Sequence, residues 1–399
     1  MLSNGIKQIP ADAIFKLTEL YNLDDHPQKV NLGQGTYKTN EGKPFVFPAV
    51  KEAKQRLLDG YHEYLPILGL PQFREAAKKL VFGKETEAST SGRLASSQAL
   101  SGTGSLHLAG AFLRRVAKSD STVHITEPTW SNHRAVFESV GFAVKAYQYL
   151  DAAGGLDFDA LRGTLQSAKE GDVFVFHASA HNPSGRDHTG EQWEEICAIM
   201  QQKQLFPLFD AAYLGLTTGD FDNDAWPIRY FASKGMELAV CLSFAKMMGL
   251  YGERVGALIF QTRTAEETPI VESHLENLMR IEISNPPAFG ARVAATVLSD
   301  PKLEASWRAD LKLMSLRLQN MRQKLISELK RLGLPRNFDH VTEQVGMFTI
   351  LGLDVAQVRV LRNDYHIYMP DSSRISIAGL NDSNITYVAD SITKVCSGA

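Results

Sequence analysis

Short apolar runs alternate with longer amphipathic stretches through the middle of the chain. The apolar runs have the length and composition of buried strands and cover residues 122–126, 173–176, 206–209, 238–242 and 256–260. The stretches between them have helical spacing at residues 131–139, 158–168 and 190–203. This alternation predicts an α/β fold with a mostly parallel central sheet and helices on both faces. Ligands of such folds bind at the carboxyl ends of the strands.

The C-terminal part of the chain has a different pattern. Residues 301–332 are charged and favour helix, with no internal proline or glycine. Short apolar runs follow at residues 345–351 and 374–377, with helical patterns from residue 354 and over residues 384–395. These short elements predict a smaller α+β domain after the long helix. The N-terminal segment is a candidate to pack with it.

Composition narrows the class of protein. The 399 residues are 44% hydrophobic and 22% charged with a net charge of −3, so the chain has neither a disordered composition nor a nucleic-acid footprint. The widely spaced cysteines Cys197, Cys241 and Cys396 suggest no disulfide framework and no metal site. No apolar stretch has membrane-spanning length, and the first residues lack the features of a signal peptide or presequence. We therefore expect a cytoplasmic protein without membrane or nucleic-acid partners.

Lys246 is the most informative residue at a predicted strand end. It follows the apolar run 238–242, where desolvation disfavours the charged amine and leaves a nucleophile. Ser243 and Arg254 add a hydroxyl and a fixed cation, a set that suits an aldehyde cofactor carrying a phosphate. The alternative is a structural lysine whose amine reaches solvent.

A run of small residues precedes the helical pattern over residues 106–117. Ser101, Gly102 and Thr103 belong to this run, and small residues before a helix allow backbone N–H groups to bind phosphate. Neither the P-loop signature nor the dinucleotide-binding pattern is present. A plain turn with a helix cap is the alternative.

Three further polar residues lie at predicted strand ends. Asn182 precedes Pro183 and is therefore held extended; an ordinary Asn-Pro turn is the alternative. Asp210 ends a very apolar strand, where a protonated ring nitrogen would be a suitable partner; a helix N-cap is the alternative. Tyr213, three residues later, could donate a hydrogen bond to the same ring. His177 is either part of this group or a core histidine.

Trp130 offers a stacking surface for a planar ring, although a buried core aromatic would have the same pattern. Arg280 and Arg374 are candidate carboxylate clamps, because a guanidinium group pairs with a carboxylate through two hydrogen bonds; either could be a surface arginine. The whole set of strand-end groups is what pyridoxal 5′-phosphate requires.

The chain resembles the class I, fold-type I aminotransferases of the aspartate aminotransferase family. The similar segments include Gly-Leu-Tyr-Gly-Glu-Arg-Val-Gly at residues 249–256, and also residues 30–33, 63–70, 100–104, 128–133, 181–183, 206–213, 224–231, 284–287 and 290–292. The resemblance implies an N-terminal arm (residues 1–11), a small domain (12–45 and 314–399) and a large cofactor-binding domain (46–313). It also implies a homodimer with shared active sites.

The resemblance implies a role for each matching residue. Lys246 would form the covalent linkage to the cofactor aldehyde and move the substrate proton. Asp210 would keep the pyridine nitrogen protonated, with His177 behind it, and Tyr213 and Asn182 would hydrogen-bond the ring oxygen. Trp130 would stack on the ring and also contact substrate. The phosphate would be held by Ser101, Gly102, Thr103, Ser243, Arg254 and, from the neighbouring subunit, Tyr64. Substrate would be bound by Gly35, Trp130, Asn182, Arg374 and the neighbour's copy of Arg280.

The sequence departs from the family pattern mainly around the substrate. The unusual residues are Gln34, Thr36, His107, Glu282, Ile283 and Ser373. The first hypothesis is amino transfer from L-aspartate to 2-oxoglutarate, giving oxaloacetate and L-glutamate. The second is a specialised paralogue that uses the same cofactor on another amino acid, by transamination, lyase or β-substitution chemistry. A non-catalytic binding protein is disfavoured because Lys246, Asp210 and Tyr213 are all present.

Overall fold

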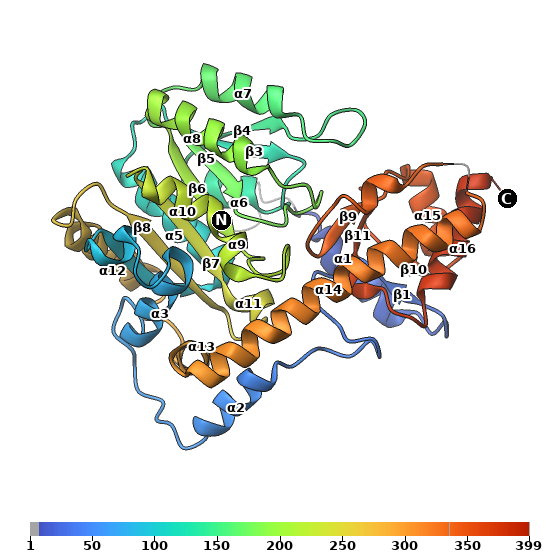
Figure 1. Ribbon diagram of the computed structural model, residues 1–399, viewed down its shortest axis with the longest axis horizontal. Helices are drawn as coiled ribbons and strands as arrows, with labels where there is room; N and C mark the ends of the chain where they lie inside the picture. The colour runs from blue at the N-terminus through green and yellow to red at the C-terminus, as the bar shows by residue number, and fades with distance from the viewer. Residues whose placement is uncertain (1–7, 335, 399) are drawn as a thin grey trace. The chain divides into compact units, whose positions relative to one another are not determined.

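The computed structural model describes residues 8–334 and 336–398 of the chain. These residues form two compact units (Figure 1). One unit comprises residues 45–317 and 344–346, and the other comprises the described parts of residues 1–44, 318–343 and 347–399. These two units are defined by contacts within the structure, and the domain boundaries predicted from the sequence stay a prediction. Residues 1–7 of the expected arm lie outside the described residues.

The first unit is built on a seven-stranded sheet with the strand order β2-β8-β7-β6-β5-β3-β4. The strands are β2 (Leu94–Leu100), β3 (Thr122–Glu127), β4 (Ala143–Gln148), β5 (Val173–His177), β6 (Phe206–Ala211), β7 (Leu238–Ser243) and β8 (Val255–Gln261). β8 runs antiparallel to both of its neighbours, β2 and β7, and the other pairs of neighbouring strands are parallel. The mostly parallel sheet predicted from the apolar runs is therefore confirmed.

Two strands of this sheet, β2 and β4, were not predicted. Each lacks a continuous apolar run, but for a different reason. β2 is almost fully buried, but its middle is polar. Its polar groups find partners inside: the Ser96 amide donates to Glu272 Oε1 (3.1 Å), and Gln98 Nε2 donates to the Pro287 carbonyl (2.7 Å). β4 lies at the sheet edge and is mostly exposed. Neither strand can show the apolar run that identified the others.

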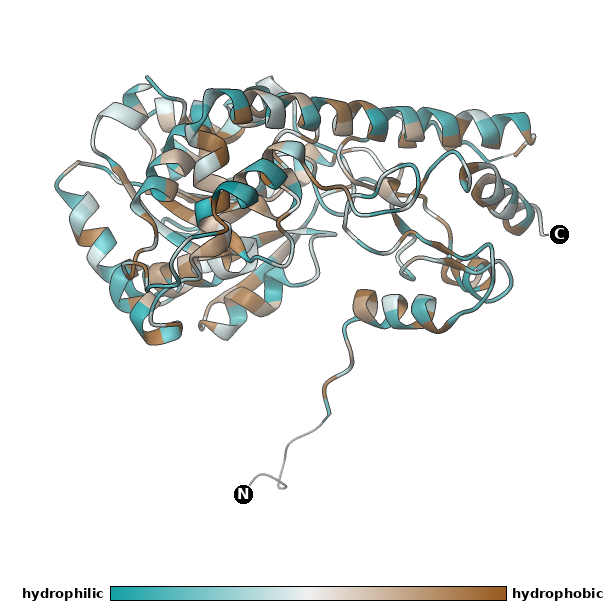
Figure 2. Ribbon diagram, turned by 90° about the horizontal axis from the view of Figure 1, so that it is seen from below, coloured by the Kyte–Doolittle hydropathy of each residue, from teal (hydrophilic) through white to brown (hydrophobic). Residues whose placement is uncertain are grey.

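Helices cover both faces of this sheet (Figure 1). They are α2 (Pro48–Arg56), α3 (Pro71–Phe82), α4 (Glu87–Thr90), α5 (Ser101–Val116), α6 (His133–Ser139), α7 (Phe158–Ser167), α8 (Gly190–Lys203), α9 (Phe221–Asp224), α10 (Trp226–Ser233), α11 (Phe244–Met247), α12 (Glu267–Glu282) and α13 (Phe289–Ser299). Leu106 of α5 and Leu275 of α12 belong to one buried cluster with the strands. Trp193 of α8 and Phe231 of α10 pack against Phe209 of β6. Figure 2 colours the ribbon by hydropathy, and hydrophobic stretches in brown occur among both the strands and the helices of this unit.

The second unit contains short elements, as the sequence predicted. They are α1 (Ala13–Leu23), β1 (Val30–Asn31), η1 (Asp339–Val341), β9 (Phe348–Ile350), α15 (Val355–Asn363), β10 (Ile367–Tyr368), β11 (Arg374–Ser376), η2 (Ile377–Gly379) and α16 (Ile385–Ser397). β1 pairs with β10 in parallel, and β9 pairs with β11 antiparallel. The predicted long helix is α14 (Pro301–Arg331), whose residues belong partly to each unit. None of the helices in the described residues could cross a bilayer.

Candidate active site

The carboxyl ends of β5, β6 and β7 meet the beginning of α5 around one small cavity. Most of the predicted cofactor residues line it, and the full lining is Ser101, Gly102, Thr103, Leu106, Trp130, His177, Asn182, Asp210, Ala212, Tyr213, Ser243, Lys246 and Arg254. Leu106 and Ala212 were not predicted; both are apolar residues inside predicted motifs and carry no chemical signal of their own. Residues from separate parts of the sequence thus converge because parallel strands end at the same edge.

The run of small residues at 101–104 is itself the first turn of α5. The helix was predicted to begin at Leu106, which is wrong, because glycines in the first turn of a helix resemble a loop in the sequence. The early start leaves the first N–H groups of α5 at the cavity, where a helix N-terminus favours an anion. The Ser101 and Ser243 hydroxyls are 2.9 Å apart, and Ser243 Oγ also accepts from the Ala245 amide (3.3 Å). The run is therefore helix and not a turn that precedes the helix, while its binding of phosphate stays a prediction.

Gly256 of β8 is needed for this close approach. A Cβ atom at this position would lie 2.7 Å from the Ser101 Cα atom, closer than any real contact. Arg254, two residues earlier, is exposed and has a positive φ of 53°. Its Nη1 donates to the Tyr251 carbonyl (2.9 Å), which holds the guanidinium group at the cavity. The cavity therefore combines a helix N-terminus, two hydroxyls and a cation, the chemistry of a phosphate site.

Asp210 lies inside β6 and is buried, so the helix N-cap alternative is wrong. Its Oδ2 atom is 3.1 Å from Nε2 of His133. Burial opposes ionisation of this carboxyl, but the His133 hydrogen bond and nearby positive charge, including Lys246, outweigh it and lower the pKa of Asp210. The residue is therefore an anion that faces the cavity and can pair with a cationic ring nitrogen.

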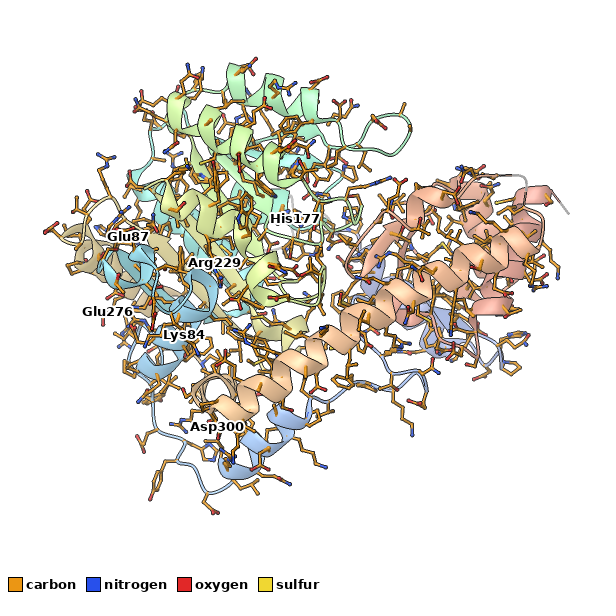
Figure 3. The ribbon with its side chains drawn as sticks, in the orientation of Figure 1. Lys84, Glu87, His177, Arg229, Glu276 and Asp300 are labelled. Carbon is orange, nitrogen blue, oxygen red and sulfur yellow. The ribbon has the colours of Figure 1, made fainter. Side chains whose placement is uncertain are left out.

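Two histidines stand behind Asp210, where only His177 was expected. His133 is the one that contacts the Asp210 carboxylate, and its Nδ1 atom is 2.8 Å from the Thr129 hydroxyl. The same hydroxyl is 3.3 Å from Nε2 of His177, which is labelled in Figure 3. Burial lowers the pKa of His177 to about 3, so its ring is neutral. His133 follows Trp130 by three residues, but this spacing carries no signal of its contact with Asp210, which lies 77 residues further along the chain.

Lys246 lies in α11, directly after β7. Burial lowers the pKa of its amine, and Arg254 lowers it further, against an opposite effect of Asp210. The Nζ atom lies 5.1 Å from the centroid of the Tyr213 ring, which is itself buried. The amine is thus enclosed and its charged form is disfavoured, which are the conditions that a nucleophilic lysine requires.

Asn182 and Trp130 complete the cavity wall. Asn182 is buried, follows β5 and precedes a cis proline bond, and its backbone N–H donates to Nδ1 of His177 (3.3 Å). The Trp130 ring is half-buried and meets the His133 ring edge-on at 5.3 Å between centroids. The indole therefore has little freedom to leave the cavity wall.

Four of the predicted site residues do not line this cavity. Tyr64 is 88% exposed. Arg280 is exposed near the end of α12, where its guanidinium group donates to the Ser284 hydroxyl. Gly35 and Arg374 belong to the other unit, in which Arg374 donates to the Gly33 carbonyl and lies 4.3 Å from the centroid of the Phe348 ring.

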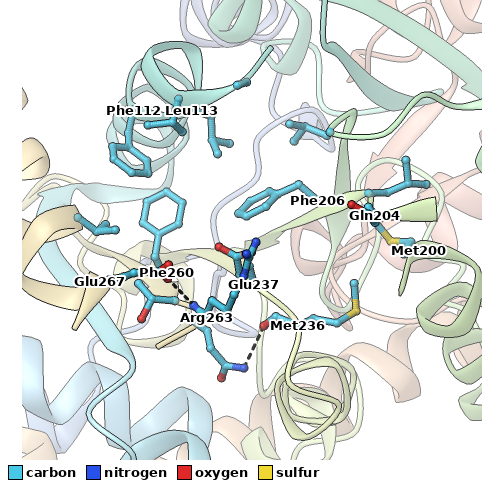
Figure 4. Close-up of a pocket in the computed structure, with 18 of the residues that line it drawn as sticks. Phe112, Leu113, Met200, Gln204, Phe206, Met236, Glu237, Phe260, Arg263 and Glu267 are labelled. Atoms are coloured by element: carbon cyan, nitrogen blue, oxygen red, sulfur yellow. Dashed lines mark hydrogen bonds and ion pairs between the residues drawn. The ribbon is translucent and has the colours of Figure 1, made fainter. Parts of the chain in front are cut away.

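A larger cavity of about 720 Å³ opens elsewhere on the same unit (Figure 4). It lies at the start of β5 and β6 and the end of β8, and none of the predicted site residues lines it. Phe112, Phe206 and Phe260 form much of its wall, and Arg263 pairs with Glu237 at 2.8 Å. None of its charged side chains is buried, whereas the smaller cavity holds the buried carboxylate of Asp210.

Known proteins resemble this chain over nearly its whole length. The family model described as aminotransferase class I and II matches residues 27–392. A cytoplasmic aspartate aminotransferase of Oryza sativa subsp. japonica is 45% identical, with 97% of this chain and 96% of the relative covered. The structure of aspartate aminotransferase from Saccharomyces cerevisiae cytoplasm has a TM-score of 0.97 at 40% identity and covers 100% of this chain and 99% of that one.

A solved structure of an aminotransferase named for a different substrate class is similarly close in fold. The aromatic-amino-acid aminotransferase of Burkholderia pseudomallei, covalently bound to pyridoxal phosphate, has a TM-score of 0.96 at 38% identity. The alignment covers 99% of each chain. Backbone similarity at this level therefore does not separate dicarboxylic from aromatic substrates.

Proposed function

Because the chain belongs to the aminotransferase class I and II family, we propose that it transfers the amino group of L-aspartate to 2-oxoglutarate with pyridoxal 5′-phosphate as cofactor. The products are oxaloacetate and L-glutamate, formed in two half-reactions at one site. The observation that carries the proposal is the convergence of Lys246, Asp210 and the α5 N-terminus on one cavity. The cytoplasm is the proposed location, because relatives at this identity include cytoplasmic enzymes.

The chemistry of the cavity fits the cofactor at both ends. The α5 N-terminus, the paired hydroxyls of Ser101 and Ser243 and the Arg254 cation suit a phosphate. The ionised, buried Asp210 suits a protonated pyridine nitrogen. When bound, pyridoxal phosphate supplies an aldehyde for covalent attachment and a ring that withdraws electrons.

The side chains of this chain then have distinct tasks. Lys246 provides the amine for attachment and, once released, accepts and returns the proton of the substrate α-carbon. Asp210 keeps a proton on the ring nitrogen, and its hydrogen bond to His133 fixes the carboxylate in place. Tyr213 and Asn182 direct hydrogen-bond donors to the ring oxygen, and Trp130 covers the ring. Thr103 and Gly102 contribute the N–H groups of the α5 first turn.

Substrate binding uses residues outside this cavity. Arg374 clamps the α-carboxylate beside Gly35, while Arg280 and Tyr64 serve the active site of a second copy of the chain. Exposure of Arg280 and Tyr64 supports this homodimer, as do the large apolar side chains Leu58, Tyr61 and Ile281, which are also exposed. Burial of such side chains on association is a strong driving force.

A second candidate is the same chemistry on another amino acid. Glu282 lies two residues from Arg280 along the chain, and its Oε1 atom is 3.2 Å from Nδ1 of His107. An acidic group at this position supports altered recognition of the distal carboxylate. The similarity to an aromatic-amino-acid aminotransferase points the same way.

The decisive experiment is an amino-donor screen with 2-oxoglutarate that quantifies glutamate, the new 2-oxo acid and any released small molecule. We expect aspartate to give the highest kcat/KM. Arg280→Ala should lower kcat/KM for aspartate far more than for phenylalanine. Purified protein that stays colourless after addition of pyridoxal phosphate would overturn the function as a whole; a preference for an aromatic donor would overturn only the substrate.

A further inference from the structure

The connection from β5 to α8 folds back so that Asp187 supports the backbone just before Asn182. The two carboxylate oxygens of Asp187 are both used: Oδ2 accepts from the Ala180 amide (2.7 Å) and Oδ1 from the His181 amide (2.9 Å). The Thr217 hydroxyl is 3.5 Å from Oδ2. Burial raises the pKa of Asp187 while these hydrogen bonds oppose the rise. A partly desolvated carboxylate thus accepts hydrogen bonds from two consecutive backbone amides.

The supported backbone has an unusual conformation. Ala180 has a positive φ of 53°, which an alanine adopts only when its surroundings hold it there. Gly346 packs against its other side: a Cβ atom at residue 346 would lie 2.3 Å from the Ala180 Cβ. The neighbouring Val345 amide donates to the Gly185 carbonyl (2.7 Å). Ala180 is therefore held between the Asp187 carboxylate and the backbone of residues 345 and 346.

The ring of His181 fixes the other side of the turn. Its Nε2 atom is 2.9 Å from the Thr126 hydroxyl at the end of β3, and its Nδ1 atom is 2.8 Å from the Ser184 hydroxyl. The ring also stacks on Tyr149 at 3.8 Å between centroids. Asn182 follows directly, with its side chain in the cavity wall. Little freedom remains for the Asn182 Cα once residues 180 and 181 are fixed.

We propose that Asp187 is a positioning residue that holds Asn182 in its cofactor-binding orientation through the amides of Ala180 and His181. This inference rests on the proposed role of Asn182 at the ring oxygen of pyridoxal phosphate. A carboxylate is suited to the task because it accepts at both oxygens. An asparagine of the same shape would accept at one and turn an NH2 group toward the other amide donor.

The matched test compares Asp187→Asn with Asp172→Asn. Asp172 is buried at the other end of β5 and also accepts with both oxygens, from the Thr122 amide and from His124. Its replacement therefore has a similar structural cost away from the cavity. The first readout is hydrogen exchange of the protein without cofactor. Asp187→Asn should speed exchange at the amides of residues 180 and 181 by about tenfold or more, and Asp172→Asn should not.

The second readout is the dissociation constant of pyridoxal phosphate, measured by fluorescence quenching. We expect about a tenfold increase for Asp187→Asn and less than about a twofold change for Asp172→Asn. In an Asn182→Ala background, Asp187→Asn should add little, because its effect passes through Asn182. An equal loss in both backgrounds would overturn the positioning role. No effect of Asn182→Ala on its own would instead refute the proposed role of Asn182.

Ala180→Gly keeps the test decisive if Asp187→Asn does not fold. Glycine adopts the positive φ without strain and leaves both hydrogen bonds to Asp187 in place, but frees the backbone before Asn182. We expect a smaller change in the same direction, about a threefold weaker affinity for pyridoxal phosphate. Unchanged affinity together with faster exchange at residues 180 and 181 would show that backbone freedom there does not reach the cofactor, and would overturn the proposal.

Discussion

The two ends of the seven-stranded sheet each carry a cavity, and the smaller one is the proposed active site. At the starts of β5 and β6, the cavity of about 720 Å³ is walled by phenylalanine rings, and its Arg263 and Glu237 satisfy each other. At the carboxyl ends, the smaller cavity holds Lys246 and Asp210, each with a pKa shifted by its surroundings. The enclosed ionisable groups at convergent strand ends, rather than cavity volume, support the proposed site.

The difference follows from the direction of the strands and helices. At the carboxyl ends, each strand passes into a loop that can place a polar side chain, and α5 begins with its free N–H groups at the cavity. The opposite end receives no such helix N-terminus from α5, whose last turn instead contributes Val116 to the larger cavity.

The largest effect is expected from matched lysine replacements at the two ends. Lys246→Ala should lower kcat/KM by about 10⁵-fold or more, because it removes both the attachment point and the proton acceptor. Lys118→Ala, at the rim of the larger cavity, should change it by less than about twofold. Steady-state kinetics with aspartate and 2-oxoglutarate provides the measurement. A comparable loss for both variants would remove the distinction between the ends.

Asp210→Asn should lower kcat/KM by about 10³-fold, because a neutral amide no longer favours a proton on the ring nitrogen. Asp224→Asn is the control: Asp224 is also a buried carboxylate of this unit, but it accepts from the amides of Gly215 and Thr217 and does not line the cavity. Its replacement should lower the melting temperature and leave kcat/KM within a few-fold. Full activity of Asp210→Asn would contradict the assigned role.

Phe260→Ala should affect stability and leave the chemistry intact. The ring is 3% exposed and packs against Phe112 at 4.9 Å between centroids, so its removal should cost about 3–5 kcal/mol of unfolding free energy. Urea unfolding measures this loss, and kcat/KM of the folded fraction should be unchanged. A fall in kcat/KM at full folding would mean that the two ends of the sheet are energetically coupled.

The sequence could predict features that depend on local patterns, but not those that depend on contacts between distant segments. The strand-end motifs were found because apolar runs end in polar residues with distinct chemistry, as at Lys246 and Asp210. β2 was missed because the partners of its buried polar groups, Glu272 and Pro287, are distant in sequence. His133 had no assigned role because its hydrogen bond to Asp210 joins separate strand ends. Contacts between distant segments are invisible to local periodicity.

The smallest expected effect is a pH dependence from the carboxyl end of the sheet. Burial lowers the pKa of His177 to about 3, so this ring is neutral in the folded protein, whereas it gains a proton in the unfolded chain below about 6.5. The unfolded state therefore binds more protons between these values, and stability must fall as the pH drops through this window. At pH 5 the loss from this residue alone is about 2 kcal/mol relative to neutral pH.

His177→Asn should remove that part of the acid sensitivity. Urea unfolding of the protein without cofactor, at pH 5 and pH 8, gives the difference in unfolding free energy between the two conditions. We expect this difference to shrink by about 2 kcal/mol in the variant, whereas His62→Asn, at an exposed loop position, should leave it unchanged. An unchanged difference in His177→Asn would mean that the ring is already protonated in the fold at pH 5. In that case the His177 ring near Asp210 would carry a positive charge at pH 5, and the two ends of the sheet would differ in charge as well as in shape.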